Sequence, residues 1–402
     1  MKNAQQQLES LLREPPGAAR ARQKGAFGKA AANRRRIVIF GAGRLGRMVR
    51  QGLVGTDLDV AAFADNNPRS WGTVIDGLPV LSGDEAACKH SHEAVFVVAV
   101  WHPSHAPLMA ELLAQLRRLG CCVVPFPLLF WHYAGSFLPY FFWDLPEHLL
   151  EQGNHMAAAF ELLDDEASRQ TFVAQLQLRL HADFNCIGAP CTGDQYFPGL
   201  FSMSADECFV DCGSYTGDTI QSFISQIDNR FRKVIAFEAD PAVMPSLQEF
   251  LNGIGSRASL HRAVVGAHNG VVRFAGNGIG GGCITDATGS EVDCVRLDDA
   301  LAQEHVSFIK MDIKGAELQA LEGAQGIIRR DRPVLAICGY HRPDHFWRVL
   351  ASLKALAPDS ALFLRAHCAD GLDAVFYAVP PERRLRTASH GRSRAHAQGS
   401  QS

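Results

Sequence analysis

Residues 208–219 read CFVDCGSYTGDT, an apolar run that ends at Asp211 and is followed by two glycines, Gly213 and Gly217. A short, continuous apolar run of this kind is typical of a buried strand in a parallel sheet. The glycines permit a tight turn into a following helix. An acidic residue before the turn disfavours a pyrophosphate and favours a cationic or hydroxyl-bearing ligand. The stretch therefore predicts a strand–turn–helix unit with a ligand at the carboxyl end of the strand.

Further apolar runs repeat this pattern towards the C-terminus. Helix-like stretches such as 316–329, with apolar residues on one face, lie between them. Alternating strands and helices predict a doubly wound sheet covered on both faces. The expected strands are 208–211, 234–238, 260–265, 308–311, 334–338, 361–365 and 374–379.

Glu238 stands at the end of the second of these strands, at the same edge of the expected sheet as the glycine turn. Its carboxylate can accept hydrogen bonds from both hydroxyls of a ribose. S-adenosylmethionine offers a ribose together with an ammonium and a sulfonium, and so suits both Asp211 and Glu238. These residues favour S-adenosylmethionine as the cofactor of this unit.

Two more titratable residues, Asp312 and His341, follow the fourth and fifth expected strands. Open α/β sheets bind ligands at this edge. Asp312 is therefore the first candidate for the base that takes a proton from an acceptor, and His341 is the second. The alternative for Asp312 is the N-cap of a helix over residues 315–330; the site role is favoured, and both roles can hold. Glu317, in the first turn of that helix, is interpreted first as a surface charge that compensates the helix dipole, with a direct role in the site as the alternative.

Four motifs in order resemble the FkbM-type S-adenosylmethionine-dependent methyltransferases over about residues 195–380. They are VDCGSYTGDT (210–219), FEADP (237–241), FIKMDIKGAELQALEGA (308–324) and RPVLAICGYHR (332–342). The resemblance implies a class I methyltransferase fold, with a seven-stranded sheet whose last strand is antiparallel. It also implies O-methylation of a hydroxyl on a sugar, a glycan or a small metabolite.

The resemblance assigns roles to individual residues. The segment 310–312 would face the transferred methyl group, with Asp312 and His341 as the catalytic candidates. Lys314 stands where the family often has an acidic residue, which leaves that position without an assigned role. The implied cofactor-binding residues are Asp211, Gly213 and Gly217 in the turn, Glu238 at the ribose, and Ala239 and Asp240 near the adenine.

A second glycine motif, GAGRLG at residues 41–46, follows an apolar run and opens a helical stretch. In this context Gly41, Gly43 and Gly46 allow a diphosphate to approach free N–H groups at the helix start. Asp65 ends the next expected strand, where its carboxylate can bind a ribose. The motif predicts a Rossmann-like N-terminal domain with a site for a nucleotide or nucleotide-sugar. The alternative is a turn that simply requires glycine.

Two enzyme classes fit these motifs. The leading hypothesis is an S-adenosylmethionine-dependent methyltransferase acting on a small-molecule or glycan acceptor. The alternative is an NAD- or nucleotide-sugar-dependent oxidoreductase or sugar-modifying enzyme centred on GAGRLG. That motif has no evident acid–base pair for hydride transfer downstream of it. A non-catalytic nucleotide sensor is a third interpretation, and the complete set of residues around the second motif counts against it.

The chain is therefore predicted to be an α/β protein with two doubly wound sheet domains. We place the Rossmann-like domain at 36–125 and the methyltransferase domain at 207–380, joined by an aromatic and helical connecting region at 126–206. Both ends, 1–35 and 381–402, are rich in basic residues, and we expect a flexible leader and a flexible tail there.

Residues 123–143 contain no Asp, Glu, Lys or Arg, a stretch long enough to span a bilayer. Pro125, Pro127 and Pro139 interrupt it, and aromatic residues dominate its second half. We therefore expect a buried segment between the domains and no transmembrane helix, with shallow membrane contact as the alternative. A subunit interface in a homo-oligomer would have the same composition.

Charge and cysteine usage limit the other functions. The net charge of the 402 residues is −3, but the basic ends leave residues 37–380 strongly acidic. An acidic body argues against nucleic acid as a partner. The eleven cysteines form no CxxC pair. This pattern favours a reduced, cytoplasmic protein and predicts no metal site.

Overall fold

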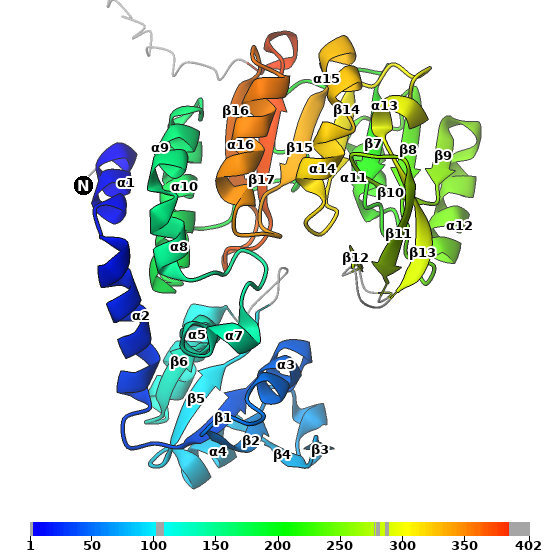
Figure 1. The fold of residues 1–402 in the computed structure, drawn as a ribbon. Coiled ribbons are helices and arrows are strands. Elements are labelled where there is room, and N and C mark those ends of the chain that lie inside the picture. The colour runs from blue at the N-terminus through cyan, green and yellow to red at the C-terminus, as the bar shows by residue number, and fades with distance from the viewer. Residues whose placement is uncertain (1–2, 102–107, 277, 279–281, 286–288, 386–402) are drawn as a thin grey trace, which may run out of the picture.

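The computed structural model describes residues 3–101, 108–276, 278, 282–285 and 289–385. Figure 1 shows an N-terminal sheet in the lower part of the view and a larger C-terminal sheet in the upper part, with helices running along one side of both. The α/β class with two doubly wound sheets is confirmed.

The N-terminal sheet has six strands in the order β3-β4-β2-β1-β5-β6, all parallel except the short edge strand β3. Its central strands β1 (Arg36–Phe40) and β5 (Ala94–Val98) are almost fully buried, because helices cover both faces of the sheet. The other elements are β2 (Asp59–Ala64), η1 (Pro68–Ser70), β3 (Val74–Ile75), β4 (Leu78–Leu81), β6 (Cys122–Pro125), α3 (Arg44–Gly52), α4 (Gly83–His90) and α5 (Met109–Arg118).

The C-terminal sheet has seven strands in the order β16-β17-β15-β14-β7-β8-β9. The last strand, β17 (Ala374–Val379), pairs antiparallel with both of its neighbours, as the family resemblance implied. The other strands are β7 (Cys208–Cys212), β8 (Lys233–Phe237), β9 (Ala258–His261), β14 (Phe308–Met311), β15 (Val334–Cys338) and β16 (Ala361–Ala366). The helices of this part are α11 (Asp218–Gln226), α12 (Met244–Ile254), η2 (Gly255–Arg257), α13 (Leu297–Ala300), α14 (Glu317–Glu322), α15 (Gln325–Asp331), α16 (His345–Leu356) and η3 (Pro381–Arg383).

The strand expected at 260–265 is divided in two by Arg262. Its first half belongs to β9, and its second half, β10 (Ala263–Val265), begins a separate four-stranded sheet in the order β10-β13-β11-β12. The sequence pattern does not distinguish one strand from two, because apolar residues lie on both sides of Arg262. The remaining strands of this small sheet are β11 (Gly270–Ala275), β12 (Cys283–Ile284) and β13 (Ser290–Val295).

The structure contradicts the expectation of a flexible leader. Helices α1 (Ala4–Leu12) and α2 (Pro16–Ala30) occupy this segment and pack against the connecting helices. Asn3 caps the first helix with a reciprocal capping box. Leu8 and Phe27 are only 2% and 1% exposed. The buried residues of these two helices are widely spaced and lie among many charged residues, so the sequence shows only a weak helical pattern. The basic composition therefore led to the wrong prediction of a flexible leader.

The connecting region consists of five helices with an aromatic segment among them. Trp131, Phe142 and Trp143 are buried, and the guanidinium of Arg179 lies 4.1 Å from the ring centre of Phe142 and 4.3 Å from that of Phe346. No helix in the described ranges is long and apolar enough to cross a membrane. The helices are α6 (Phe126–His132), α7 (Ala134–Phe137), α8 (Pro146–Glu151), α9 (Gly153–Glu161) and α10 (Glu166–His181).

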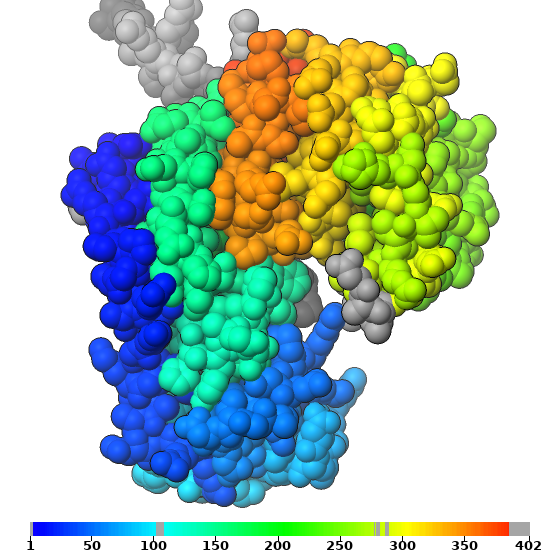
Figure 2. Space-filling model, in the orientation of Figure 1, coloured from blue at the N-terminus to red at the C-terminus, as the bar shows by residue number. Residues whose placement is uncertain are grey.

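The carboxyl edge of the N-terminal sheet contacts the C-terminal part. Trp101, just beyond β5, donates its indole N–H to the backbone oxygen of Asp370 at 2.9 Å. The carboxylate of Asp370 accepts from the backbone N–H of Met109 at the start of α5. Figure 2 shows a hollow between the N-terminal and C-terminal parts on the face in view. These contacts fix the two sheets relative to each other around this hollow.

Candidate active site

A cavity of about 450 Å³ lies at the carboxyl ends of β7, β8 and β14. Its size is within the range of small-molecule sites. A larger open groove of about 850 Å³ beside α12 shares only Ala239 with this cavity and contains neither catalytic candidate. The cavity is lined by Gln195, Tyr196, Gly213, Tyr215, Asp218, Thr219, Phe237, Glu238, Ala239, Asp240, Val243, Ala263, Val264, Val265, Phe274, Gly282, Ile284, Lys310, Asp312, Ile313, Lys314, Ala316, Tyr340 and Asp373.

Glu238 joins the two turns at one end of the cavity. Its Oε2 accepts from the backbone N–H of Tyr215 in the glycine turn at 2.8 Å. Its Oε1 accepts from the backbone N–H groups of Ala239 and Asp240 at 2.7 and 2.8 Å. A carboxylate has about four acceptor positions, so Glu238 keeps capacity for a ligand while it orders both turns.

Asp211 lies behind the glycine turn and does not line the cavity. It is completely buried, and its Oδ1 lies 2.8 Å from Nζ of Lys310, which also donates to the backbone oxygen of Gly213 at 2.7 Å. Burial raises the pKa of Asp211 to about 6 against the opposing effect of Lys310. Burial alone would lower the pKa of Lys310, but Asp211 and Asp312 together raise it. This buried pair therefore holds the turn in place from below.

Gly213 and Gly217 both have left-handed backbone angles, with φ of 81° and 91°. A Cβ at Gly213 would collide with the backbone oxygen of Asp312, and one at Gly217 would collide with the ring of Phe250. Gly213 lines the cavity, whereas Gly217 begins α11 without facing it. Glycine is thus required at both positions by conformation and by space.

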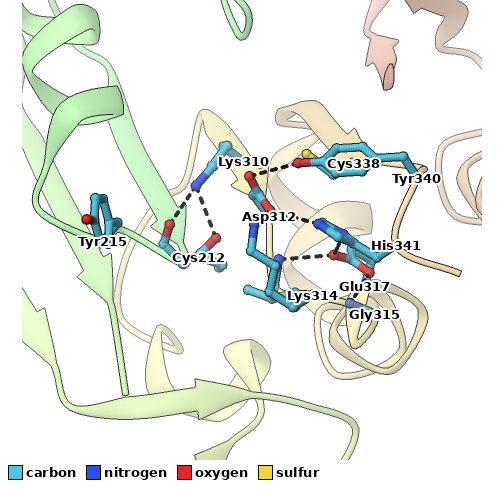
Figure 3. Close-up of polar contacts among 12 residues, drawn as sticks. Cys212, Tyr215, Lys310, Asp312, Lys314, Gly315, Glu317, Cys338, Tyr340 and His341 are labelled. Atoms are coloured by element: carbon cyan, nitrogen blue, oxygen red, sulfur yellow. Dashed lines mark hydrogen bonds and ion pairs between the residues drawn. The ribbon is translucent and has the colours of Figure 1, made fainter. Parts of the chain in front are cut away.

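Asp312 lies at the other end of the cavity, and Figure 3 shows its contacts. Its Oδ1 lies 2.6 Å from Nζ of Lys314 and 3.2 Å from Nε2 of His341. Its Oδ2 accepts from the hydroxyls of Tyr196 and Tyr340 at 3.2 and 3.4 Å. Burial would raise the pKa of Asp312, but Lys314, His341 and Lys310 hold it well below its usual range. This carboxylate therefore stays ionised.

Glu317 lies behind His341 (Figure 3). Its Oε1 lies 2.8 Å from Nδ1 of His341, and its Oε2 lies 3.2 Å from Nδ1 of His345. Burial lowers the pKa of His341, but Glu317 and Asp312 outweigh this effect and raise it. Likewise, burial would raise the pKa of Glu317, but the two histidines hold it far below its usual range. Asp312, His341 and Glu317 thus form a continuous row from the cavity into the core.

The interpretation of Glu317 as a dipole-compensating surface charge is wrong, since its side chain is fully buried. Its oxygens accept from the backbone N–H groups of Ile313 and Gly315, each at 3.0 Å. The capping role considered for Asp312 is also wrong, because α14 begins at Glu317 and its N-cap is Ala316. In the sequence, the available signal for the buried position of Glu317 is that an acidic residue stands two positions after a turn glycine. This pattern is too common to predict a buried carboxylate.

A family model described as the methyltransferase FkbM domain matches residues 211–367. The chain contains an FkbM methyltransferase domain. The crystal structure of methyltransferase FkbM from Methylobacillus flagellatus KT has the same fold, with a TM-score of 0.78 at 23% identity over 94% of this chain and 100% of that chain. UDP-D-quinovosamine 4-dehydrogenase from Vibrio fischeri matches 23% of this chain and 77% of that chain at 23% identity, with a TM-score of only 0.19. No curated protein matches the chain.

Within the FkbM domain, the cavity brings together most of the residues predicted from sequence. Gly213, Glu238, Ala239, Asp240 and Asp312 line it. The other three predicted residues lie just outside: Asp211 behind the glycine turn, Gly217 at the end of that turn where α11 begins, and His341 behind Asp312.

Asp240 also contacts Gly278, in the glycine-rich stretch 276–282. Its Oδ2 accepts from the backbone N–H of Gly278 at 2.9 Å. Residues 277 and 279–281 lie outside the described residues. The contact places Gly278 beside Asp240, one of the residues that line the cavity.

The glycine turn upstream of the FkbM domain repeats the arrangement found at Glu238. Asp65 accepts from the backbone N–H of Ala42 at 2.8 Å and so joins the turn after β1 to the end of β2. Gly41 has a φ of 118°, and a Cβ at Gly46 would collide with the backbone oxygen of Gly41. Gly43 precedes α3 and makes no side-chain cap. The four predicted residues therefore lie at one turn.

Proposed function

We propose that this protein is an S-adenosylmethionine-dependent O-methyltransferase whose acceptor is the hydroxyl of a sugar or another small metabolite. The observation that carries the proposal is one cavity with the Glu238 turn at one end and the Asp312 carboxylate at the other. The family match to the FkbM domain supports the reaction class.

Glu238, Ala239 and Asp240 would hold the adenosyl part of the cofactor. The carboxylate of Glu238 is already oriented by three backbone N–H groups. It can therefore accept from ribose hydroxyls without a large entropic cost for its own ordering. When bound, S-adenosylmethionine supplies an electrophilic methyl group.

Asp312 would orient the acceptor hydroxyl and receive its proton, with the acceptor hydroxyl taking the position of the Tyr340 hydroxyl, whose contact is the longest of the four at 3.4 Å. Because the pKa of Asp312 is low, its carboxylate accepts a hydrogen bond in the ground state and takes the proton late in the reaction. An oxygen that is forming a bond to carbon becomes strongly acidic, so a weak base suffices. His341 and Lys314 hold the carboxylate in place, and Glu317 holds His341.

We also propose that the turn containing Gly41, Gly43, Gly46 and Asp65 binds a nucleotide or the nucleotide part of a nucleotide-sugar acceptor. The exposed start of α3 offers free backbone N–H groups to a diphosphate. Under this proposal the N-terminal sheet helps to bind the acceptor. It does not form the active site of a separate oxidoreductase.

The setting we propose is the cytoplasm. All eleven cysteines are free thiols in the structure. Several are deeply buried, including Cys212 and Cys338 beside the candidate site. This usage of cysteine as a small apolar residue suits a reducing compartment.

Isothermal titration tests the proposal directly. The full-length protein is titrated with S-adenosylmethionine and, in parallel, with NAD⁺, NADP⁺ and UDP-glucose. Saturable binding of S-adenosylmethionine that is lost in Glu238→Ala supports the methyltransferase proposal. Binding of a nicotinamide nucleotide alone, lost on substitution of Asp65, would instead support the oxidoreductase alternative.

A further inference from the structure

The hydroxyl of Tyr340 lies between two carboxylates that line the cavity. Its oxygen lies 3.4 Å from Oδ2 of Asp312 (Figure 3), and it also makes a side-chain hydrogen bond with Asp373. Burial and the charge of Asp312 raise the pKa of Tyr340 well above its ordinary value, so the phenol keeps its proton. Because a phenol has one hydrogen to donate, Tyr340 can satisfy only one of the two carboxylates fully at a time.

The mechanism proposed for Asp312 leaves Asp373 unused, and Asp373 lies beyond the family match, which ends at residue 367. The loop before it is anchored. Trp101 of the N-terminal part donates to the backbone oxygen of Asp370 at 2.9 Å, and the backbone N–H of His367 donates to the backbone oxygen of Asp373 at 3.1 Å. Cys368 in this loop stays a neutral thiol, because burial raises its pKa to about 11. A fixed loop therefore presents the carboxylate of Asp373 to the cavity.

Tyr196 shows why Tyr340 is the hydroxyl that an acceptor displaces. Its hydroxyl also donates to Oδ2 of Asp312, at 3.2 Å, and it contacts Sγ of Cys338 at 3.5 Å. Sulfur is a weak acceptor, so Tyr196 would exchange a charged partner for a poor one if it left Asp312. Tyr340 would exchange one carboxylate for another, which makes its displacement the less costly of the two.

The charged and titratable groups around Asp373 keep its carboxylate available to Tyr340. Burial and the charge of Asp312 raise the pKa of Asp373 to about 6, against the opposing effects of Tyr340, Lys314 and His341. Asp373 is therefore mainly ionised at neutral pH. An ionised carboxylate is a strong acceptor for a phenol hydroxyl.

We propose that Asp373 is a positioning residue of the acceptor site, which takes over the hydrogen bond of Tyr340 when the acceptor hydroxyl occupies Oδ2 of Asp312. This inference rests on the proposed function for the position of the acceptor. The exchange leaves no buried hydroxyl unpaired, so the new hydrogen bond to Asp312 is not offset by the loss of another. It adds to the acceptor site a residue from outside the family match.

NMR of the full-length protein, with aspartate labelled by ¹³C at the carboxyl carbon, tests the shared hydrogen bond directly. The hydrogen bond from Tyr340 lowers the pKa of Asp373, so Tyr340→Phe should raise this pKa. Tyr196→Phe is the matched control. It removes the other hydroxyl at Asp312 and should leave the pKa of Asp373 nearly unchanged.

Ethylene glycol is the probe for the exchange, because it is small enough to bring a hydroxyl to Asp312. In the wild type it should shift the Asp312 resonance and lower the pKa of Asp373, since Tyr340 then donates fully to Asp373. In Tyr340→Phe only Asp312 should respond. The resonance of Asp228, whose side chain is 85% exposed, reports the effect of the probe on the solvent.

Two substitutions at Asp373 separate its carboxylate from its place in the loop. Asp373 has a φ of 52°, a conformation that both glycine and asparagine tolerate. Asp373→Gly leaves the displaced Tyr340 without an acceptor and should raise the ethylene glycol concentration for half of the Asp312 shift about tenfold. Asp373→Asn keeps an acceptor oxygen and should remain close to the wild type. Melting temperatures verify that both variants fold.

An unchanged pKa of Asp373 in Tyr340→Phe would overturn the inference. So would equal responses to ethylene glycol in the wild type and Asp373→Gly, or an Asp312 resonance that does not respond to the probe at all. These measurements use the protein without cofactor. Failure of the wild type to bind S-adenosylmethionine would therefore refute the proposed function separately, and a confirmed exchange would then show a hydroxyl site without methyl transfer.

Discussion

Nδ1 of His341 lies 2.8 Å from Oε1 of Glu317, while Nε2 of the same ring lies 3.2 Å from Oδ1 of Asp312. The imidazole therefore lies between two carboxylates, one lining the cavity and one fully buried. Glu317 holds the ring in place, so Asp312 is presented to the acceptor by a chain of buried groups. In this arrangement Glu317 controls the protonation of His341.

Glu317→Gln should lower the pKa of His341 and reduce turnover while leaving S-adenosylmethionine affinity nearly unchanged. Glu317 and Asp312 raise the pKa of His341 above its ordinary 6.5 against the effect of burial. The protonated ring therefore stabilises the fold fully below about pH 6.5, and this contribution is lost as the pH rises through the folded-state pKa. In the variant, that loss should begin at lower pH.

NMR titration of the His341 ring, with unfolding measured across the same pH range, checks this prediction. Glu322→Gln is the matched control, because Glu322 lies on the same helix and is exposed. If the pKa of His341 is unchanged in Glu317→Gln, the role of Glu317 is only to order the turn by accepting from the backbone N–H groups of Ile313 and Gly315.

The sheets and most of the cavity follow from local sequence patterns. Apolar runs that end in Asp211, Glu238 and Asp312 place their carboxylates at one edge, because parallel strands end on the same side. Which of them face the cavity depends on pairing across strands. Asp211 lies behind the turn because Lys310, on the neighbouring strand β14, forms an ion pair with it. Neither segment alone therefore predicts that Asp211 points away from the cavity.

The parts that sequence reasoning missed depend on packing between distant segments. Glu317 is buried because His341 and His345 reach it from beyond the next strand. The first two helices are ordered because Leu8 and Phe27 find apolar partners in the connecting region. In each case the local pattern is compatible with a surface position, and tertiary contacts decide the outcome.

Asp312→Asn should reduce turnover far more than cofactor affinity. The amide keeps the size of the side chain but is a much weaker acceptor for a proton and a weaker partner for Lys314. Steady-state kinetics with the acceptor and titration with S-adenosylmethionine separate the two effects. Asp228→Asn, at a side chain 85% exposed and remote from the cavity, is the control. Equal losses of turnover and affinity would make Asp312 a structural residue.

Glu238→Ala should weaken S-adenosylmethionine binding by about 1.5–3 kcal/mol, the range for hydrogen bonds to a charged group. The backbone N–H groups of Tyr215, Ala239 and Asp240 also lose their acceptor, so the turns become less ordered. Glu238→Gln keeps one acceptor oxygen and should lose less affinity. Calorimetry on both variants, with exposed Glu291→Ala as the control, measures the difference. Unchanged affinity in a folded Glu238→Ala protein would refute the ribose assignment.

Lys310→Met should destabilise the fold by about 3–5 kcal/mol, because it leaves the carboxylate of Asp211 buried without its partner. The double variant Asp211→Asn with Lys310→Met removes the unpaired charge and should recover much of this loss. Urea unfolding of the wild type, both single variants and the double variant gives the coupling free energy. Additive losses would mean that the two residues do not act as a pair. A strong coupling with normal S-adenosylmethionine affinity in the folded double variant would mean that the pair supports the turn without contacting the cofactor.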